Sequence, residues 1–354
     1  MTRSNYQHKI ILILIVVLIS GCTQKSHEKE ALEKVGAKYA EQFFFDEASG
    51  DIMLLDPSGN ATALRCDTAG ERLVCLSSTH IAFLTAIGEA GHIVGAPDSA
   101  YIFDNDIKAK IRLGETAIVA SGAALNAELI LELAPSAIFT DNMRASEMTL
   151  FETQGIPVIY IEEFRENSPL ARAEWIKVFG CVTGKQHLAD SIFCTIEAEY
   201  IELKNIVAEN TKVRPTIFGG TEYQGVWYVS GGASYIAGFY QDAGTEYVFA
   251  DNNHTLSIPM DFEAVYEKGM ECDFWRIVFA SSSKVSYNML EGFNAHYADF
   301  NAFKNKSVIL CNPAESAYFE KGVIEPHIIL ADLVYAVHPE LIPEHKPVYY
   351  RILN

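Results

Sequence analysis

One uninterrupted amphipathic segment, residues 185–210, constrains the fold of this chain most strongly. It contains no glycine or proline, and its apolar residues recur at helical spacing: Leu188, Ile192, Ile196, Tyr200, Leu203 and Val207. A helix over this range would span about 39 Å at 1.5 Å per residue. That length far exceeds the average for a globular protein. The segment therefore predicts a rigid helix that forms one side of a large domain or joins two lobes.

Strands alternate with helices on both sides of this segment. Short apolar runs bounded by turn residues predict strands at 72–76, 92–97, 137–140, 157–161, 214–220, 247–251, 274–281 and 307–312. Such alternation indicates βαβ units with parallel sheets, so the predicted fold class is α/β. We expect one lobe over 43–184, which begins with a hairpin near 43–64 and ends in a single helix over 168–184. The second lobe is expected over 211–354, with 185–210 as the interlobe helix.

The N-terminus has the features of an export signal. Ile10 to Ile19 is an apolar run of signal-peptide length, too short to span a bilayer comfortably, and Ile19-Ser20-Gly21-Cys22 follows the pattern of a bacterial lipobox. We predict a signal peptide over 1–21, lipidation at Cys22 and a polar tether over 22–42. The protein would then be exported and held at a membrane, on a periplasmic face or a cell surface. An ordinary signal peptide or membrane anchor is the alternative.

Composition excludes several classes of function. The net charge is −19 and no basic run is visible, which argues against nucleic-acid binding. The seven cysteines form no CxxC pair, so neither a zinc ribbon nor a thioredoxin-like site is expected. Export would permit disulfides, but the sequence does not select a pair.

Enzyme motifs are missing as well. The segment Gly231-Gly232-Ala233-Ser234 lacks the lysine of a P-loop, and neither GxGxxG nor GxSxG occurs. We therefore expect no catalytic activity and no cofactor of the protein's own.

Three motifs in order resemble the class III periplasmic substrate-binding proteins, which bind ferric siderophores, haem or cobalamin for ABC importers. They are "RLVCLSSTHIAFLTAIGEAGHIVGAP" from Arg72, "LNAELILELAPSAIFT" from Leu125, and "AVHPEL" from Ala336. Ser136 stands where the family usually has aspartate. The resemblance covers the chain from about Arg72. It implies two Rossmann-like lobes, one bridging helix and a ligand cleft between the lobes.

Aromatic side chains gather in the loops that follow the predicted strands, where ligands of α/β sheets bind. A cleft lined with rings suits a large flat metal chelate, although rings can also pack beneath their own loops. By the resemblance, Tyr101, Tyr228 and Lys321 fall at ligand-contacting positions, with Lys321 equally readable as a solvated lysine. The predicted ligand-binding residues are Tyr101, Phe103, Tyr223, Trp227, Tyr228, Tyr235, Tyr318 and Lys321.

The resemblance also implies partners. One exposed glutamate on each lobe docks to the permease in this family. Glu263 matches on lobe two, whereas Arg112 occupies the aligned site on lobe one and Glu115 lies nearby. The implied function is capture of a metal chelate by a monomeric, lipid-anchored protein that works with an ABC permease and its ATPase. A lipid-anchored sensor or adhesin and a bare zinc or manganese receptor are the alternatives.

Overall fold

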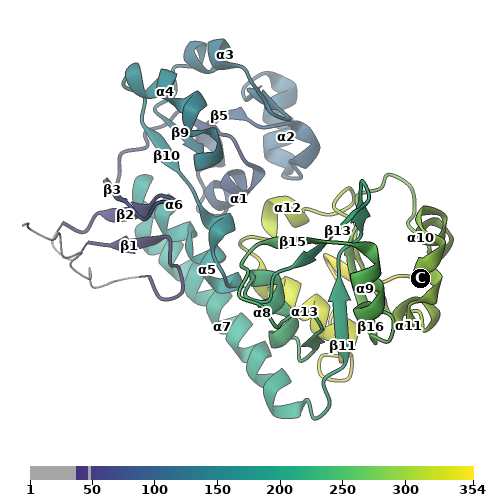
Figure 1. Cartoon of the computed structure of the whole chain (residues 1–354). Coiled ribbons are helices and arrows are strands. Elements are labelled where there is room, and N and C mark those ends of the chain that lie inside the picture. The colour runs from purple at the N-terminus through teal and green to yellow at the C-terminus, as the bar shows by residue number, and fades with distance from the viewer. Residues whose placement is uncertain (1–36, 47–48) are drawn as a thin grey trace, which may run out of the picture. The chain divides into compact units, whose positions relative to one another are not determined.

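The interlobe segment forms one helix, α7 (Gln186–Asn210), as predicted. The computed structural model describes residues 37–46 and 49–354, so the predicted signal peptide, Cys22 and the tether up to residue 36 lie outside the described residues. The helix packs against α6 (Ile176–Val182) and α13 (Pro326–Val337), and thereby joins the two halves of the chain (Figure 1). The buried face differs slightly from the predicted one, because Ala189 and Phe193 point inward while Leu188 is exposed.

Lobe one is a parallel sheet covered by helices. Its strand order is β10-β9-β4-β5-β6, and all four pairings are parallel. The rings of Phe83 and Phe139 both stack on Phe179, so α6 is part of the core of this lobe. The strands are β4 (Leu73–Cys75), β5 (Ile93–Ala96), β6 (Ala117–Ile118), β9 (Ala137–Thr140) and β10 (Val158–Tyr160). The helices are α1 (Ser78–Ala86), α2 (Asn105–Leu113), α3 (Ala127–Glu132) and α4 (Ala145–Thr153), with a two-stranded hairpin of β7 (Ala120–Ser121) and β8 (Ala124–Leu125).

Lobe two repeats this plan with one addition. Its sheet has the order β14-β11-β16-β17-β18, and β18 is antiparallel to its neighbour. Strand β18 was not predicted from the sequence. The buried carboxylate of Asp332 holds it by accepting the backbone amides of Tyr349 and Tyr350. The strands are β11 (Thr216–Gly219), β14 (Glu246–Tyr247), β16 (Phe274–Val278), β17 (Val308–Cys311) and β18 (Tyr350–Ile352). The helices besides α13 are α8 (Tyr235–Asp242), α9 (Phe262–Gly269), α10 (Tyr287–Phe293), α11 (Asn301–Lys304) and α12 (Tyr318–Lys321).

A second, antiparallel sheet occupies lobe two where loops were expected. It consists of β12 (Glu222–Tyr223), β13 (Val226–Ser230) and β15 (Ser257–Met260), in the order β12-β13-β15. Because side chains alternate along a strand, Trp227 and Val229 point into the core and Tyr228 points out. This sheet therefore decides which aromatic residues of the segment can reach a ligand.

The connection into α7 is two helices, not the single helix that we predicted. Helix α5 (Pro169–Glu174) ends at Trp175, and α6 follows directly. Ser168 caps α5 by accepting the amide of Ala171, with Pro169 in the first turn. The break places α5 against α8 and α13 of lobe two while α6 stays in lobe one.

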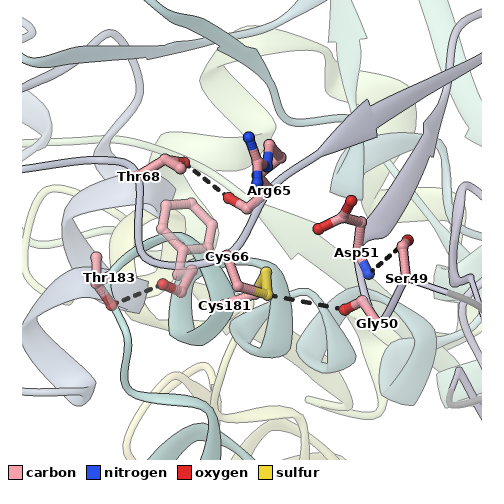
Figure 2. The surroundings of a disulfide bond; sticks show 9 residues. Ser49, Gly50, Asp51, Arg65, Cys66, Thr68, Cys181 and Thr183 are labelled. Atoms are coloured by element: carbon pink, nitrogen blue, oxygen red, sulfur yellow. Dashed lines mark hydrogen bonds between the residues drawn. A yellow bond between two sulfur atoms is a disulfide. The ribbon is translucent and has the colours of Figure 1, made fainter.

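The N-terminal addition is a three-stranded antiparallel sheet, one strand more than a hairpin. Its strands are β1 (Phe43–Phe45), β2 (Ile52–Leu55) and β3 (Ala61–Leu64). Cys66, just after β3, forms a disulfide with Cys181 in α6 (Figure 2). The segment around Cys66 also donates backbone hydrogen bonds to the end of α6, from Asp67 to Cys181 at 2.7 Å and from Thr68 to Val182 at 3.0 Å.

The last residues of the predicted tether are bound to the fold. Glu174 accepts the backbone amides of Lys38, Tyr39 and Ala40, and Glu166 accepts those of residues 41 and 42. The tether boundary at residue 42 was therefore placed too late. Within the part of the chain that the structure describes, no helix combines the length and apolarity needed to cross a bilayer.

Candidate functional site

A pocket of about 390 Å³ lies at the carboxyl ends of the lobe-two strands. We call it the lobe-two pocket. Three of the predicted residues, Tyr228, Tyr235 and Tyr318, line it together with the exposed ring of Phe319. The remaining lining residues are Gly220, Ser230, Ser234, Ile236, Thr255, Leu256, Ser257, Arg276 and Val278, so its polar groups are hydroxyls and one guanidinium.

Three elements build this pocket. Ser234 caps α8 by accepting the amide of Ala237 at 3.2 Å, which sets Tyr235 at the first turn of the helix. Strand β13 turns Tyr228 outward. Strand β16 sends Trp275 to one face of the sheet and Arg276 to the other, where the Arg276 guanidinium donates to the hydroxyls of Tyr318, at 3.0 Å, and Tyr350.

A smaller pocket of about 210 Å³, the lobe-one pocket, lies at the corresponding edge of the first sheet. It is lined by Tyr101, which is 55% exposed, and by Arg144, together with Ser77 and Ser78 at the start of α1. Ser77 caps α1 by accepting the amide of Thr79. Arg144 is held in place by the carbonyls of Gly122 and Ala123 and by Glu147.

The two pockets lie beside a direct contact between the lobes. Helix α1, which starts at the lobe-one pocket, packs against α12, which carries Tyr318 and Phe319 of the lobe-two pocket (Figure 1). The buried carboxylate of Glu320 on α12 accepts the backbone amides of Phe103 and Asp104, just before α2. Burial raises the pKa of Glu320, and these two amides oppose the rise.

A second interlobe contact lies behind the lobe-two pocket. The Arg172 guanidinium on α5 lies over the ring of Tyr235, with its carbon 4.2 Å from the ring centroid. The carboxylate of Glu163, which accepts the Thr79 hydroxyl at 2.8 Å, interacts electrostatically with Arg172. Burial raises the pKa of Glu163 and the charge of Arg172 lowers it.

The structure brings together only some of the predicted ligand residues. Tyr101, Tyr228, Tyr235 and Tyr318 line the two pockets. Tyr223, 64% exposed on β12, lines neither. Phe103 is half-buried under the Lys108 ammonium, 4.8 Å from the ring centroid, and contributes its backbone amide to the Glu320 contact. Lys321 is partly exposed and also lines neither pocket.

The prediction for Trp227 was wrong. Its side chain is fully buried, packs against Trp275 and Tyr297, and donates its indole N–H to the carbonyl of Gly219 at 3.0 Å. The neighbouring Gly231 has an ordinary φ. It is required because a Cβ there would lie 2.1 Å from the carbonyl oxygen of His254.

The predicted docking glutamates are both exposed. Glu263 lies in the first turn of α9, and Glu115 follows the end of α2. Arg112, which occupies the aligned lobe-one position, is exposed in the last turn of α2. These positions leave all three side chains free to meet a partner surface.

Four charged residues at these contacts were not predicted from the sequence: Arg144, Arg172, Arg276 and Glu320. Arg276 had a visible signal, since it interrupts the apolar run "FWRIVF" of a predicted buried strand. A charged residue at such a position requires a partner or a ligand. The other three depend on contacts between residues far apart in the chain, which the local pattern does not reveal.

Two other observations bear on the location of the site. A larger pocket, about 600 Å³, lies along α8 and β14, and none of the predicted residues lines it. It is lined by both acidic and basic side chains, including Arg214, Glu246 and Asp251. Among the residues that the structure describes, no group of three His, Cys, Asp or Glu side chains could hold a metal ion.

Known proteins share this architecture. An uncharacterized lipoprotein of Methanocaldococcus jannaschii is 27% identical over 296 residues, covering 80% of this chain and 69% of that protein. A periplasmic heme binding protein from Pseudomonas aeruginosa superposes with a TM-score of 0.60 at 17% identity, covering 78% of this chain and 95% of that one. The siderophore binding protein BauB, bound to ferric iron with two acinetobactin molecules, gives 0.63 at 17% identity, with 83% and 100% covered.

The family model described as "Periplasmic binding protein" matches residues 73–315. This range includes the five-stranded sheets of both lobes apart from β18, and the whole of α7. It also includes every residue that lines the two pockets except Tyr318 and Phe319. The two α/β lobes and the single long helix that joins them confirm the predicted fold class. This chain belongs to the periplasmic binding protein family.

Proposed function

We propose that this protein is the substrate-binding lipoprotein of an ABC importer, and that it captures a ferric siderophore, haem or cobalamin and delivers it to the permease. The observation that carries the proposal is the lobe-two pocket, where four aromatic side chains, one arginine and several hydroxyls meet beside the interlobe contact. Large aromatic surfaces suit a flat chelate, and hydroxyls and a guanidinium suit its polar edge. No catalytic role is proposed.

Anchoring at a membrane belongs to the same proposal. The lipobox pattern at Cys22 and the lipoprotein relatives support export and lipidation. The Cys66–Cys181 disulfide supports an oxidising compartment, where such bonds persist.

Direct binding tests the proposal. The purified full chain in detergent is titrated by calorimetry with haem, cyanocobalamin and a set of ferric siderophores, and micromolar or tighter binding of one of them is expected. Tyr228→Ala should weaken that binding at least tenfold, whereas Tyr223→Ala removes a more exposed tyrosine outside the two pockets and should leave it unchanged. Absence of micromolar binding to every chelate would overturn the proposal.

Docking is tested separately in cells. Glu263→Arg should impair uptake of the bound chelate and leave its affinity unchanged, because an exposed charge at a rim acts on association with the permease. Glu267→Arg on the same helix is the matched control and should retain uptake. If the protein binds a chelate but cells that lack the protein still take up that chelate, the lipid-anchored sensor is favoured instead.

A further inference from the structure

Arg276 is a buried cation without an anionic partner. Arg276 lies on the central strand β16, and only 8% of its surface is exposed to solvent. It takes part in none of the ion pairs found among residues 37–46 and 49–354. Burying a charge is costly unless an opposite charge and hydrogen bonds compensate it.

The two hydroxyls to which Arg276 donates belong to neutral phenols. Its guanidinium donates to the hydroxyls of Tyr318 and Tyr350, and its carbon lies 5.0 Å from the Tyr350 ring centroid. Burial raises the pKa of both tyrosines, so neither phenol is ionised at neutral pH. The hydroxyls fix the guanidinium in position and leave its positive charge uncompensated.

The uncompensated charge lies at the wall of an open pocket. Arg276 lines the lobe-two pocket, and none of the other lining residues is acidic, although the chain as a whole has a net charge of −19. Behind the same pocket, the guanidinium of Arg172 lies over the ring of Tyr235. Arg172 takes part in none of the ion pairs of the described residues, and its buried Nε has no hydrogen-bond partner. Glu163, whose charge acts on Arg172, is not among the lining residues.

We infer that the chelate carries a carboxylate-type oxyanion, which pairs with the Arg276 guanidinium in the lobe-two pocket. The planar guanidinium fork matches a carboxylate with two parallel hydrogen bonds, and Ser230, Ser234 and Ser257 offer hydroxyls beside it. This inference rests on the proposed function and narrows it. Chelates with free carboxylates, such as haem with its propionates, satisfy Arg276, whereas chelates without an anionic group leave it buried and unpaired.

Chemically matched ligands test the inference without altering the protein. The full chain is titrated by calorimetry with haem and haem dimethyl ester, and with ferric citrate and the cationic hydroxamate ferrioxamine B. In at least one pair the ligand with free carboxylates should bind at least tenfold more tightly than its counterpart. This means that haem is preferred over its dimethyl ester, or ferric citrate over ferrioxamine B. Equal affinities within both pairs, or a preference for the ester or for ferrioxamine B, would overturn the inference while leaving the proposed function intact. Binding of none of these chelates or of cyanocobalamin would overturn both.

Variants then assign the effect to the guanidinium. Arg276→Gln should weaken binding of the preferred acid by 10- to 100-fold and reduce its advantage over the counterpart ligand. Arg276→Lys retains the charge without the fork and should keep part of the preference. Arg214→Gln, at the pocket along α8 and β14, should bind as the unaltered chain does. A full acid preference in a folded Arg276→Gln variant, shown by an unchanged unfolding transition, would contradict the assignment.

Discussion

The carboxylate of Glu320 accepts a hydrogen bond from the backbone amide of Asp104 at 3.2 Å, although 216 residues separate the two in sequence. Asp104 caps α2 of lobe one, and Glu320 belongs to α12, which also carries Tyr318 and Phe319 of the lobe-two pocket. Helix α12 therefore connects the lobe-two pocket to lobe one through the buried hydrogen bond between Glu320 and Asp104. This contact is a second link between the lobes in addition to α7.

Removal of the Glu320 carboxylate should loosen this contact. Glu320→Ala leaves the amides of Phe103 and Asp104 without an acceptor, and a buried unsatisfied donor costs about 1–3 kcal/mol. We expect a decrease of that size in the free energy of unfolding, measured by urea denaturation at pH 7. Glu315→Ala, which breaks only an exposed ion pair with Arg351, should change the same quantity by less than about 1 kcal/mol. Equal losses in the two variants would contradict the buried role of Glu320.

The disulfide between Cys66 and Cys181 should contribute substantially to stability. It links residues 115 positions apart, and closing a loop of about 100 residues restricts the unfolded chain by about 4–5 kcal/mol in the entropic description. The double variant Cys66→Ser/Cys181→Ser should lose about 2–5 kcal/mol in urea denaturation, and reductant should destabilise the unaltered chain similarly. Cys194→Ser changes a free exposed thiol and serves as the control. Stability that is indifferent to reductant would refute this contribution.

His80 should make the protein sensitive to mild acid. Burial between Phe139 and Phe179 lowers the pKa of His80 from 6.5 to about 3, and a hydrogen bond with the Phe139 backbone partly opposes this. The unfolded chain takes up a proton near pH 6.5 and the folded chain does not, so stability is present above pH 6.5 and is lost as the pH falls. The loss is about 1.4 kcal/mol per pH unit.

A variant isolates this histidine from the carboxylates. Burial raises the pKa of Glu163, Glu166 and Glu320 in the folded chain. The folded chain therefore binds these protons before the unfolded chain does, and stability increases as the pH falls toward 4.5, opposite to the effect of His80. His80→Phe keeps a packed ring and removes the titration. Between pH 7 and 5 it should lose about 2 kcal/mol less than the unaltered chain in urea denaturation. The exposed His254→Phe should follow the unaltered chain, and identical pH profiles for all three proteins would exclude the effect.

Local patterns in the sequence were sufficient for the elements of the fold. The glycine-free run forms α7, and the alternation of short apolar runs with helical segments matches the parallel sheets. These features depend on residues close together in the chain. The antiparallel sheet of β12, β13 and β15 was not predicted, because its strands are short and β15 joins β13 from about thirty residues away.

The site was predictable only in part for the same reason. Loop aromatics indicated Tyr101 and Tyr228 correctly as pocket residues, but the side to which β13 turns each ring depends on its register with β15. Glu320 and Arg172 act across lobes, and no pattern of neighbouring residues indicates such contacts. Arg276 was the exception, since a lone charge in an apolar strand carries its own signal.

Trp227 and Tyr228 adjoin in sequence and should separate stability from binding. Trp227→Phe removes the indole hydrogen bond to Gly219 and part of a fully buried ring, so the free energy of unfolding should fall by about 1–3 kcal/mol, with chelate affinity retained at temperatures where the variant is folded. Tyr228→Ala removes a ring that is 46% exposed, and should weaken chelate binding while changing stability by less than about 1 kcal/mol. Urea denaturation and calorimetric titration on both variants provide the comparison. If folded Trp227→Phe loses affinity and Tyr228→Ala does not, Trp227 rather than Tyr228 contacts the ligand, which would contradict the outward placement of Tyr228.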